Sequence, residues 1–229
     1  MNILALDTSM GACSAAVLRS DGGTPRLDAR QEAMARGHAE ALMPMVAEVL
    51  AAACIAARDL DLIAATEGPG SFTGVRIAIA AARGLALATG AKLYGTDSLT
   101  VMARDALAGD LSPKGPFAVA VDARRGMIYL GIYDAAGERR DGPLLVSPDD
   151  AAHLLPNDLT LAVGSGAALL AESCARQGWR IETALPELQP SAASLAKIAL
   201  EAPATVPILR PLYLRPPDAR PQQPSVARR

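Results

Sequence analysis

The sequence contains few aromatic residues, few cysteines and little excess charge. Phe, Trp and Tyr together make up 3% of the 229 residues, so the core has to be built from smaller aliphatic side chains. Hydrophobic residues nevertheless make up 51% of the chain, which excludes a disordered protein and is enough for one large domain or two small ones. The formal net charge of −2 supplies no basic field with which this chain alone would hold a nucleic acid.

The three cysteines lack the spacing of a metal site or a disulfide framework. Cys13, Cys54 and Cys174 are scattered among apolar or small residues, so we predict three buried free thiols in a reducing compartment. The N-terminal residues MNILALDTS have neither the basic region nor the apolar core of a signal peptide. No apolar run of membrane-spanning length is free of charges and glycines. We therefore expect a soluble, cytoplasmic protein without membrane contact.

The first half of the chain reads as strands that alternate with apolar helices. A buried strand ends near Asp7, and the DGG turn at 21–23 indicates a hairpin between the second and third strands. Hydrophobic residues at helical spacing follow, and Gly90 is expected to close the second helix. The predicted strands are 2–9, 12–20, 26–35, 60–68 and 92–97, and the predicted helices are 38–54, 74–88 and 98–109.

The second half repeats this pattern. Residues 116–138 read as a strand, Asp122, a turn and a strand, as the chain does around Asp7. Residues 159–178 read as a strand, a Gly-Ser-Gly turn and a helix, as over 62–84. Between them, a helix is expected to be capped near Ser147 or Asp149. The chain is therefore predicted to contain one α/β unit twice.

Turn-forming residues place the boundary between the two units. The segment GDLSPKGP is rich in Gly, Pro and Ser, which favours a connection there. The predicted N-terminal unit is 1–108, and the predicted second unit, which is smaller and degenerate, is 109–215 and includes a last helix over 191–202. Residues 216–229 have little apolar content, so we expect a disordered tail.

A Gly-rich loop precedes the long helix of the first half. It contains Gly68, Gly70, Ser71, Thr73 and Gly74. It has no Lys-Ser/Thr pair as in a P-loop, no G-x-S-x-G as in a hydrolase elbow and no complete G-x-G-x-x-G. The residues alone leave two readings open. Either the helix N-terminus binds an anion, or Gly70 and Gly74 supply unusual backbone angles at a tight joint, and we predict that the loop is structural first.

Five motifs in order resemble the TsaB (YeaZ) family. They are LALDTS near the N-terminus, HAEALMPMV, GPGSFTGVRIAIAAARGLA, VDARRGMIY and the late PLYLR. The resemblance covers the chain from residue 2 to about residue 215. It implies an actin-like, sugar-kinase-like (ASKHA) α/β fold with two RNase H-like units in tandem, in agreement with the duplication.

The resemblance also implies a function. Members of this family are scaffold or activating subunits that pair with TsaD for threonylcarbamoyl transfer to N6 of adenosine 37, in tRNAs that read codons beginning with A. TsaE is implied as a further partner, tRNA is contacted only indirectly, and a homodimer is expected when TsaD is absent. No cofactor is implied. The alternative is an enzyme of the same fold, a peptidase or a small-molecule kinase.

Catalytic and metal-binding residues are expected to be absent. The His-x-x-x-His metal pair of TsaD would fall at Ser98 and Met102, and neither residue supplies an imidazole. The two histidines, His38 and His153, are expected to be solvated or capping. The sequence also shows no nucleophile–base pair for a peptidase and no nucleotide loops for a kinase.

Two strand-ending aspartates, Asp7 and Asp122, occupy positions where enzymes of this fold bind phosphate or Mg²⁺. Two carboxylates that face one cleft would hold Mg²⁺ through waters. A strand-ending Asp also commonly binds its own turn. We interpret both as relics that shape turns, or at most as a weak nucleotide or Mg²⁺ site.

Two apolar helices are predicted to form the partner surface. A helix that is apolar on all sides has to be covered on all sides, and the two together offer more apolar surface than one domain face hides. The alternative is that the helix over 38–54 covers the other one entirely within the monomer. The predicted partner-binding residues are Leu42, Met45, Val46 and Val49 on the first helix and Ile77, Ala78, Ala81 and Leu85 on the second.

Overall fold

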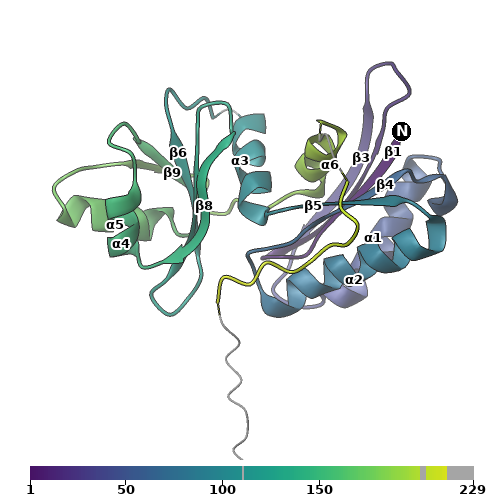
Figure 1. Ribbon diagram of the computed structural model, residues 1–229, viewed down its shortest axis with the longest axis horizontal. Coiled ribbons are helices and arrows are strands. Elements are labelled where there is room, and N and C mark those ends of the chain that lie inside the picture. Colours follow the sequence, from purple (N-terminus) through teal and green to yellow (C-terminus); the bar gives the residue numbers. More distant parts are fainter. Residues whose placement is uncertain (110, 202–204, 216–229) are drawn as a thin grey trace, which may run out of the picture.

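The computed structural model, which describes residues 1–109, 111–201 and 205–215, contains two five-stranded sheets (Figure 1). The first has the order β3-β2-β1-β4-β5 and the second the order β10-β9-β6-β7-β8. In each, three antiparallel strands are extended by two parallel ones, so the predicted duplication is confirmed. The strands of the first sheet are β1 (Asn2–Asp7), β2 (Ala12–Arg19), β3 (Arg26–Ala33), β4 (Leu62–Thr66) and β5 (Lys92–Thr96). Those of the second are β6 (Phe117–Asp122), β7 (Ile128–Tyr133), β8 (Arg139–Val146), β9 (Leu161–Val163) and β10 (Glu182–Ala184).

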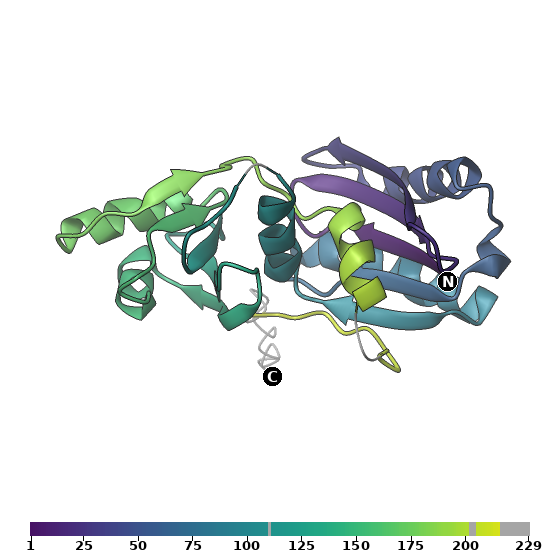
Figure 2. The same ribbon diagram turned by 90° about the horizontal axis from the view of Figure 1, so that it is seen from above.

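Helices cover both faces of the first sheet. Helices α1 (His38–Ala52) and α2 (Phe72–Thr89) lie side by side on one face, and α6 (Ala192–Glu201) lies on the other (Figures 1 and 2). The alternation of β1 explains this arrangement, because successive side chains of a strand point to opposite faces. Leu4 and Leu6 join the core under α1 and α2, whereas Ile3 and Ala5 join the core under α6.

The second sheet is covered in the same way. Helices α4 (Pro148–Leu154) and α5 (Ala167–Arg176) pack on one face, and α3 (Ser98–Ala108) packs on the other. A single 3-10 turn, η1 (Ala57–Asp59), also occurs in the described part of the chain. The side chain of Ser147 accepts a hydrogen bond from the Asp150 amide, so Ser147 caps α4, as predicted.

Each predicted unit contains one complete sheet, but each also contains a helix that packs on the sheet of the other unit. Helix α3, inside the range 1–108, contributes Leu99 and Met102 to the core of the second sheet. Helix α6, inside the range 109–215, packs on the first sheet. The two helices also contact each other, so they join the two units (Figure 2). The predicted tail, 216–229, lies outside the described residues.

The cysteines differ in exposure. Cys13 and Cys174 are buried free thiols, as predicted. Cys54 is exposed, so the prediction is wrong for this residue. It follows the end of α1 and has a φ of 54°.

Candidate functional site

The Gly-rich loop joins β4 to α2 where the backbone of another segment comes very close. A Cβ on Gly70 would lie 2.2 Å from the Ser9 carbonyl oxygen, and a Cβ on Gly74 would lie 2.0 Å from the Thr8 carbonyl oxygen. Neither glycine has a positive φ, so the predicted unusual backbone angles are wrong for both. In this loop it is Gly68 that has a left-handed φ, of 101°. Close approach of two backbones, rather than backbone angle, requires glycine at 70 and 74.

Hydrogen bonds tie this joint to the turn after β1. The Thr8 hydroxyl donates to the Gly74 carbonyl (2.6 Å) and accepts from the Ala78 amide (3.1 Å). The Ser71 amide donates to the Ser9 carbonyl (2.8 Å), and the Ser71 hydroxyl caps α2 by accepting from the Gly74 amide (2.9 Å). Thr73, in the first turn of α2, is exposed. These bonds support a structural role for the loop.

The two strand-ending aspartates both bind their own turns. Asp7 is fully buried and accepts from the amide (3.2 Å) and hydroxyl (2.8 Å) of Ser9 and from the Thr66 hydroxyl. Burial raises the pKa of Asp7 to about 6, because the charged form loses its hydration. Asp122 accepts from the amide (2.7 Å) and guanidinium (3.1 Å) of Arg124. Both aspartates thus have the contacts expected of residues that shape turns.

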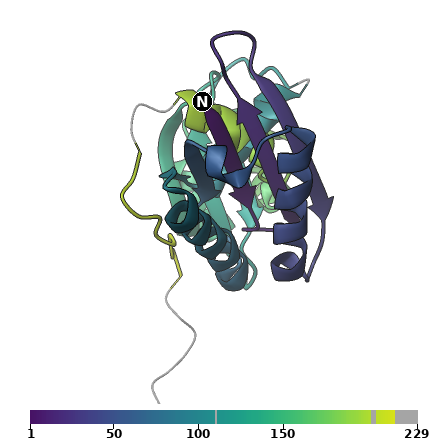
Figure 3. The same cartoon turned by 90° about the vertical axis from the view of Figure 1, so that its right-hand side faces the viewer.

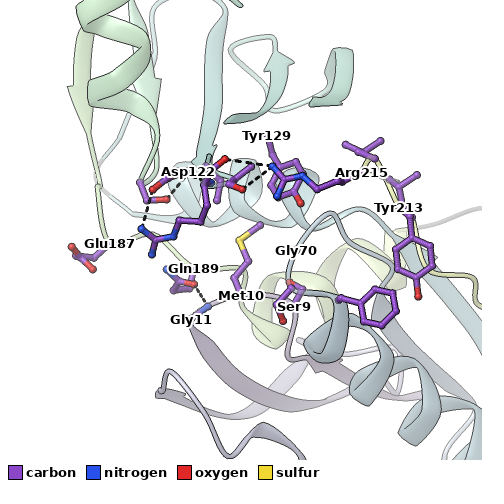
Figure 4. Close-up of a pocket in the computed structure, with 18 of the residues that line it drawn as sticks. Ser9, Met10, Gly11, Gly70, Asp122, Tyr129, Glu187, Gln189, Tyr213 and Arg215 are labelled. Atoms are coloured by element: carbon purple, nitrogen blue, oxygen red, sulfur yellow. Dashed lines mark hydrogen bonds and ion pairs between the residues drawn. The ribbon is translucent and has the colours of Figure 1, made fainter. Parts of the chain in front are cut away.

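A cleft of about 840 Å³ lies between the two units (Figure 4). Its walls come from the turn at 9–11, the Gly-rich loop, the strand and turn at 121–124, and residues 186–189 and 212–215. Asp122 lines the cleft, whereas Asp7 does not, so the two carboxylates do not face one cavity. The described residues contain no group of three or more His, Cys, Asp or Glu side chains that would hold a metal ion.

The other residues considered for chemistry have structural contacts. The Ser98 hydroxyl donates to the Pro69 carbonyl, and Met102 is fully buried in the core of the second sheet. Nε2 of His38 lies 3.1 Å from the Met10 carbonyl oxygen, and His153 is exposed on α4. Neither histidine bonds to a serine or cysteine in the part of the chain that the structure describes.

Residues 205–215, which we call the strap, run along the first unit and end at the second (Figures 1 and 3). The amide of Leu212 donates to the Glu67 carbonyl (2.6 Å), and the amide of Arg210 donates to the Glu67 carboxylate (2.6 Å). Leu209 is buried in the core of the first unit. The guanidinium of Arg215 reaches the carbonyls of the 123–124 turn. No role for the strap is predicted from the sequence, although the PLYLR motif within it is one of the five family motifs.

Most of the predicted partner-binding residues lie inside the monomer. The buried ones are Leu42, Met45, Val46, Val49 and Ala78, which are at most 7% exposed and share one core cluster. Their prediction as surface contacts is wrong, because α1 and α2 use these side chains to pack on the sheet. Ile77, Ala81 and Leu85 are half-buried at the edge of the same cluster.

The exposed side of α2 is nevertheless apolar. We call it the outer face, and its residues are Phe72, Thr73, Arg76, Ala80, Gly84, Leu87 and Ala88. Leu87 is 89% exposed.

By length and composition alone, α2 is also long and apolar enough to cross a membrane, with a mean hydropathy of 1.3. Five of its 18 residues are buried against the rest of the protein, and core helices of soluble proteins pass the same test.

Comparison with known proteins assigns the family. The model of the family described as TsaD, tRNA N6-adenosine threonylcarbamoyltransferase, matches residues 30–202. The tRNA threonylcarbamoyladenosine biosynthesis protein TsaB of Haemophilus influenzae is 30% identical over 94% of each chain. The chain belongs to the TsaB/YeaZ family. TsaB of Escherichia coli is 38% identical over 58% of this chain and 55% of its own.

A solved structure agrees with this assignment. YeaZ from Pseudomonas aeruginosa superposes with a TM-score of 0.78 at 33% identity, over 93% of this chain and 99% of its own. A second structure from the same organism, described as similar to peptidase YeaZ, has a TM-score of 0.80 at 32% identity, over 93% of this chain and 99% of its own. The TsaB/YeaZ chain thus has the expected actin-like fold, built from two tandem α/β units.

Proposed function

We propose that this TsaB-type chain is a non-catalytic subunit that pairs with TsaD. TsaD would transfer the threonylcarbamoyl group to N6 of adenosine 37 in tRNAs that read codons beginning with A. The chain would act in the cytoplasm, meet tRNA only through the complex and have TsaE as a further partner. The TsaB relatives are named for tRNA threonylcarbamoyladenosine biosynthesis, which supports this proposal.

The observation that carries the proposal is the outer face of α2. It exposes Phe72, Ala80, Gly84, Leu87 and Ala88, which we call the apolar strip, on a helix whose opposite side is already packed on the sheet. Protein–protein interfaces have apolar centres with few charges, and large exposed apolar patches mark such interfaces. Ala80, Gly84 and Ala88 are small, which lets a partner helix approach closely. Ile77, Ala81 and Leu85 flank this strip and keep their proposed partner role.

The positions that would hold a metal in TsaD support a non-catalytic role. Ser98 and Met102 serve the packing of α3, as the Ser98 bond to Pro69 and the burial of Met102 indicate. The rival proposal, a peptidase or small-molecule kinase, rests on the cleft between the units. Peptide cleavage or phosphoryl transfer by the purified chain alone would favour that rival.

The test is co-elution of the chain with TsaD in size-exclusion chromatography. Leu87→Glu would place an unpaired charge within the proposed interface, so we expect it to abolish co-elution while the circular dichroism spectrum is unchanged. Leu154→Glu is the matched control, because Leu154 is also an exposed leucine (47%) but lies on α4 of the second unit. Equal co-elution of both variants would contradict the proposal.

The same face explains the expected homodimer. Without TsaD, the apolar strip is available to a second copy of the chain, and two identical strips would meet about a twofold axis. Leu87→Glu is then expected to convert the isolated protein to a monomer, with sedimentation velocity as the measurement. A dimer that survives this substitution would place the self-contact elsewhere.

A further inference from the structure

An exposed cluster of two rings and one arginine lies at the N-terminal end of the outer face. The rings of Phe72 and Tyr213 are stacked with their centroids 5.5 Å apart and their planes 28° apart. The central carbon of the Arg76 guanidinium lies 3.4 Å from the Phe72 centroid and 5.3 Å from the Tyr213 centroid. Phe72 is 54% exposed and Tyr213 is 46% exposed. Three large side chains are thus assembled in contact with solvent.

The cluster is held in place from both sides. Phe72 is the first residue of α2 and follows the cap residue Ser71. Tyr213 comes from the strap, which is fixed on one side by the bond of Leu212 to Glu67 and on the other by the bonds of Arg215 to the second unit. Anchors that are ordered before binding lose little conformational entropy when a partner arrives. The rings therefore present the arginine in a defined position.

The guanidinium of Arg76 has its N–H donors available. In the part of the chain that the structure describes, no carboxylate or carbonyl bonds to it, and its contacts are the two rings. A guanidinium that packs with an aromatic ring leaves its edge open, and this edge matches a carboxylate with two parallel hydrogen bonds. Arg and Tyr are also enriched among the residues that dominate binding energy in interfaces.

The surroundings favour a protein carboxylate over a nucleic acid. Helix α2 contains two arginines and no acidic residue, and the other arginine, Arg83, is half-buried and donates to the Leu209 carbonyl. One available cation beside an apolar strip fits a helix that carries an acidic side chain. A nucleic acid backbone requires several cations in a row.

We infer that Phe72, Arg76 and Tyr213 form an anchor that receives an Asp or Glu side chain of the partner subunit. The inference rests on the proposed pairing with TsaD through α2. It adds an ion pair, between Arg76 and the partner's carboxylate, at one end of an otherwise apolar interface. It also gives the strap a role, because the strap supplies the Tyr213 ring.

The test is isothermal titration of the full chain with TsaD at several salt concentrations. Arg76→Gln is expected to weaken binding about tenfold to a hundredfold and to flatten the salt dependence of Kd, because the ion pair is lost. Arg76→Lys keeps the charge but lacks the planar guanidinium, so its Kd should lie between that of the unmodified chain and that of Arg76→Gln. Arg180→Gln, at an exposed arginine of the second unit, is the control and should leave Kd unchanged.

The outcomes separate the inference from the proposed function. If Leu87→Glu abolishes binding and Arg76→Gln leaves Kd and its salt dependence unchanged, the anchor is wrong and the pairing stands. If Arg76→Gln weakens binding of the complex to tRNA but not binding to TsaD, the cluster contacts nucleic acid and the inference is overturned. If the unmodified chain does not bind TsaD, both the proposed function and the inference fail.

Discussion

The two units place equivalent helices in equivalent positions, yet these helices differ on their solvent sides. Helix α2 connects the parallel strands β4 and β5, and α5 connects the parallel strands β9 and β10. The solvent side of α5 carries two charged residues, Glu172 and Arg176, beside the exposed Ala168, Leu169 and Ala175, and Arg176 pairs with Asp149 of α4. The outer face of α2 carries a single charge among small and apolar residues. The outward side chains of α5 are thus more charged than those of α2, and our proposal places the partner on α2.

The joints beneath the two helices are alike. In the second unit, a Cβ on Gly166 would lie 2.9 Å from the Val121 carbonyl carbon, and the Gly166 amide donates to the Ala120 carbonyl (2.9 Å). The Gly-rich loop of the first unit approaches the turn directly after β1, at Thr8 and Ser9. Close packing of loop against strand is thus a shared property of the fold, and the difference between the units lies in the outward side chains.

The largest expected effect is the difference in stability between a charge on the buried face of α2 and a charge on its exposed face. Ala78 is fully buried and Ala80 is exposed. Ala78→Glu would bury a charge without a partner, so we expect it to lower the free energy of unfolding by several kcal/mol, about 3 or more, or to prevent folding. Ala80→Glu should change it by less than about 0.5 kcal/mol and still abolish binding to TsaD. Urea denaturation measures the free energy of unfolding of both variants, and equal values would mean that the buried and exposed faces are wrongly assigned.

A smaller effect distinguishes the two strand-ending aspartates. The pKa of Asp7 is about 6 in the folded protein against 3.8 for the unperturbed group, so its stabilising contribution is present below about pH 4 and is lost as the pH rises through 6. Relative to Asp7→Asn, the unmodified protein should therefore lose about 3 kcal/mol of stability between pH 4 and pH 7. Parallel stability profiles for the two proteins would contradict this account of Asp7.

The matched substitution in the second unit is Asp122→Asn. The side chain of Asp122 is 28% exposed, and its partner Arg124 is 86% exposed. Solvent weakens such a pair, so we expect a loss of stability of at most about 1 kcal/mol. A loss of several kcal/mol would contradict this account of Asp122.

The smallest effect concerns thiol reactivity and leaves the fold intact. Burial raises the pKa of Cys13 to about 11 and also raises the pKa of Cys174, so both thiols should be unreactive in the folded protein. Cys54 is exposed and should react with a thiol reagent at once. We expect one fast thiol per chain, lost in Cys54→Ser, and two more after denaturation. Rapid reaction of all three would show that the cores open easily.

The sequence predicts much of this fold because the signals are local. Short apolar runs identify the central strands, and the DGG turn identifies the hairpin of β2 and β3. Which sheet a helix covers is not a local property. Helices α3 and α6 each carry an apolar stripe, but the contact that places α6 on the first sheet joins residues far apart in the chain. The division into units therefore could not be read from composition alone.

The partner surface is harder to predict for a related reason. A helix that is apolar on nearly all sides does not indicate which side meets the sheet, so Ala78 and Ala80 look alike in the sequence. The Gly74 requirement also depends on a carbonyl contributed by Thr8, from a distant segment. The cluster of Phe72, Arg76 and Tyr213 needs the strap to return to α2, which no pattern within either segment indicates.

Hydrogen–deuterium exchange of the chain with and without saturating TsaD tests the central claim most directly. It compares peptides of α2 (Phe72–Thr89) with peptides of α5 (Ala167–Arg176) in one sample. The account predicts slower exchange in α2 when TsaD is present and equal rates in α5. Slower exchange in α5 alone, or unchanged rates in both helices, would contradict it.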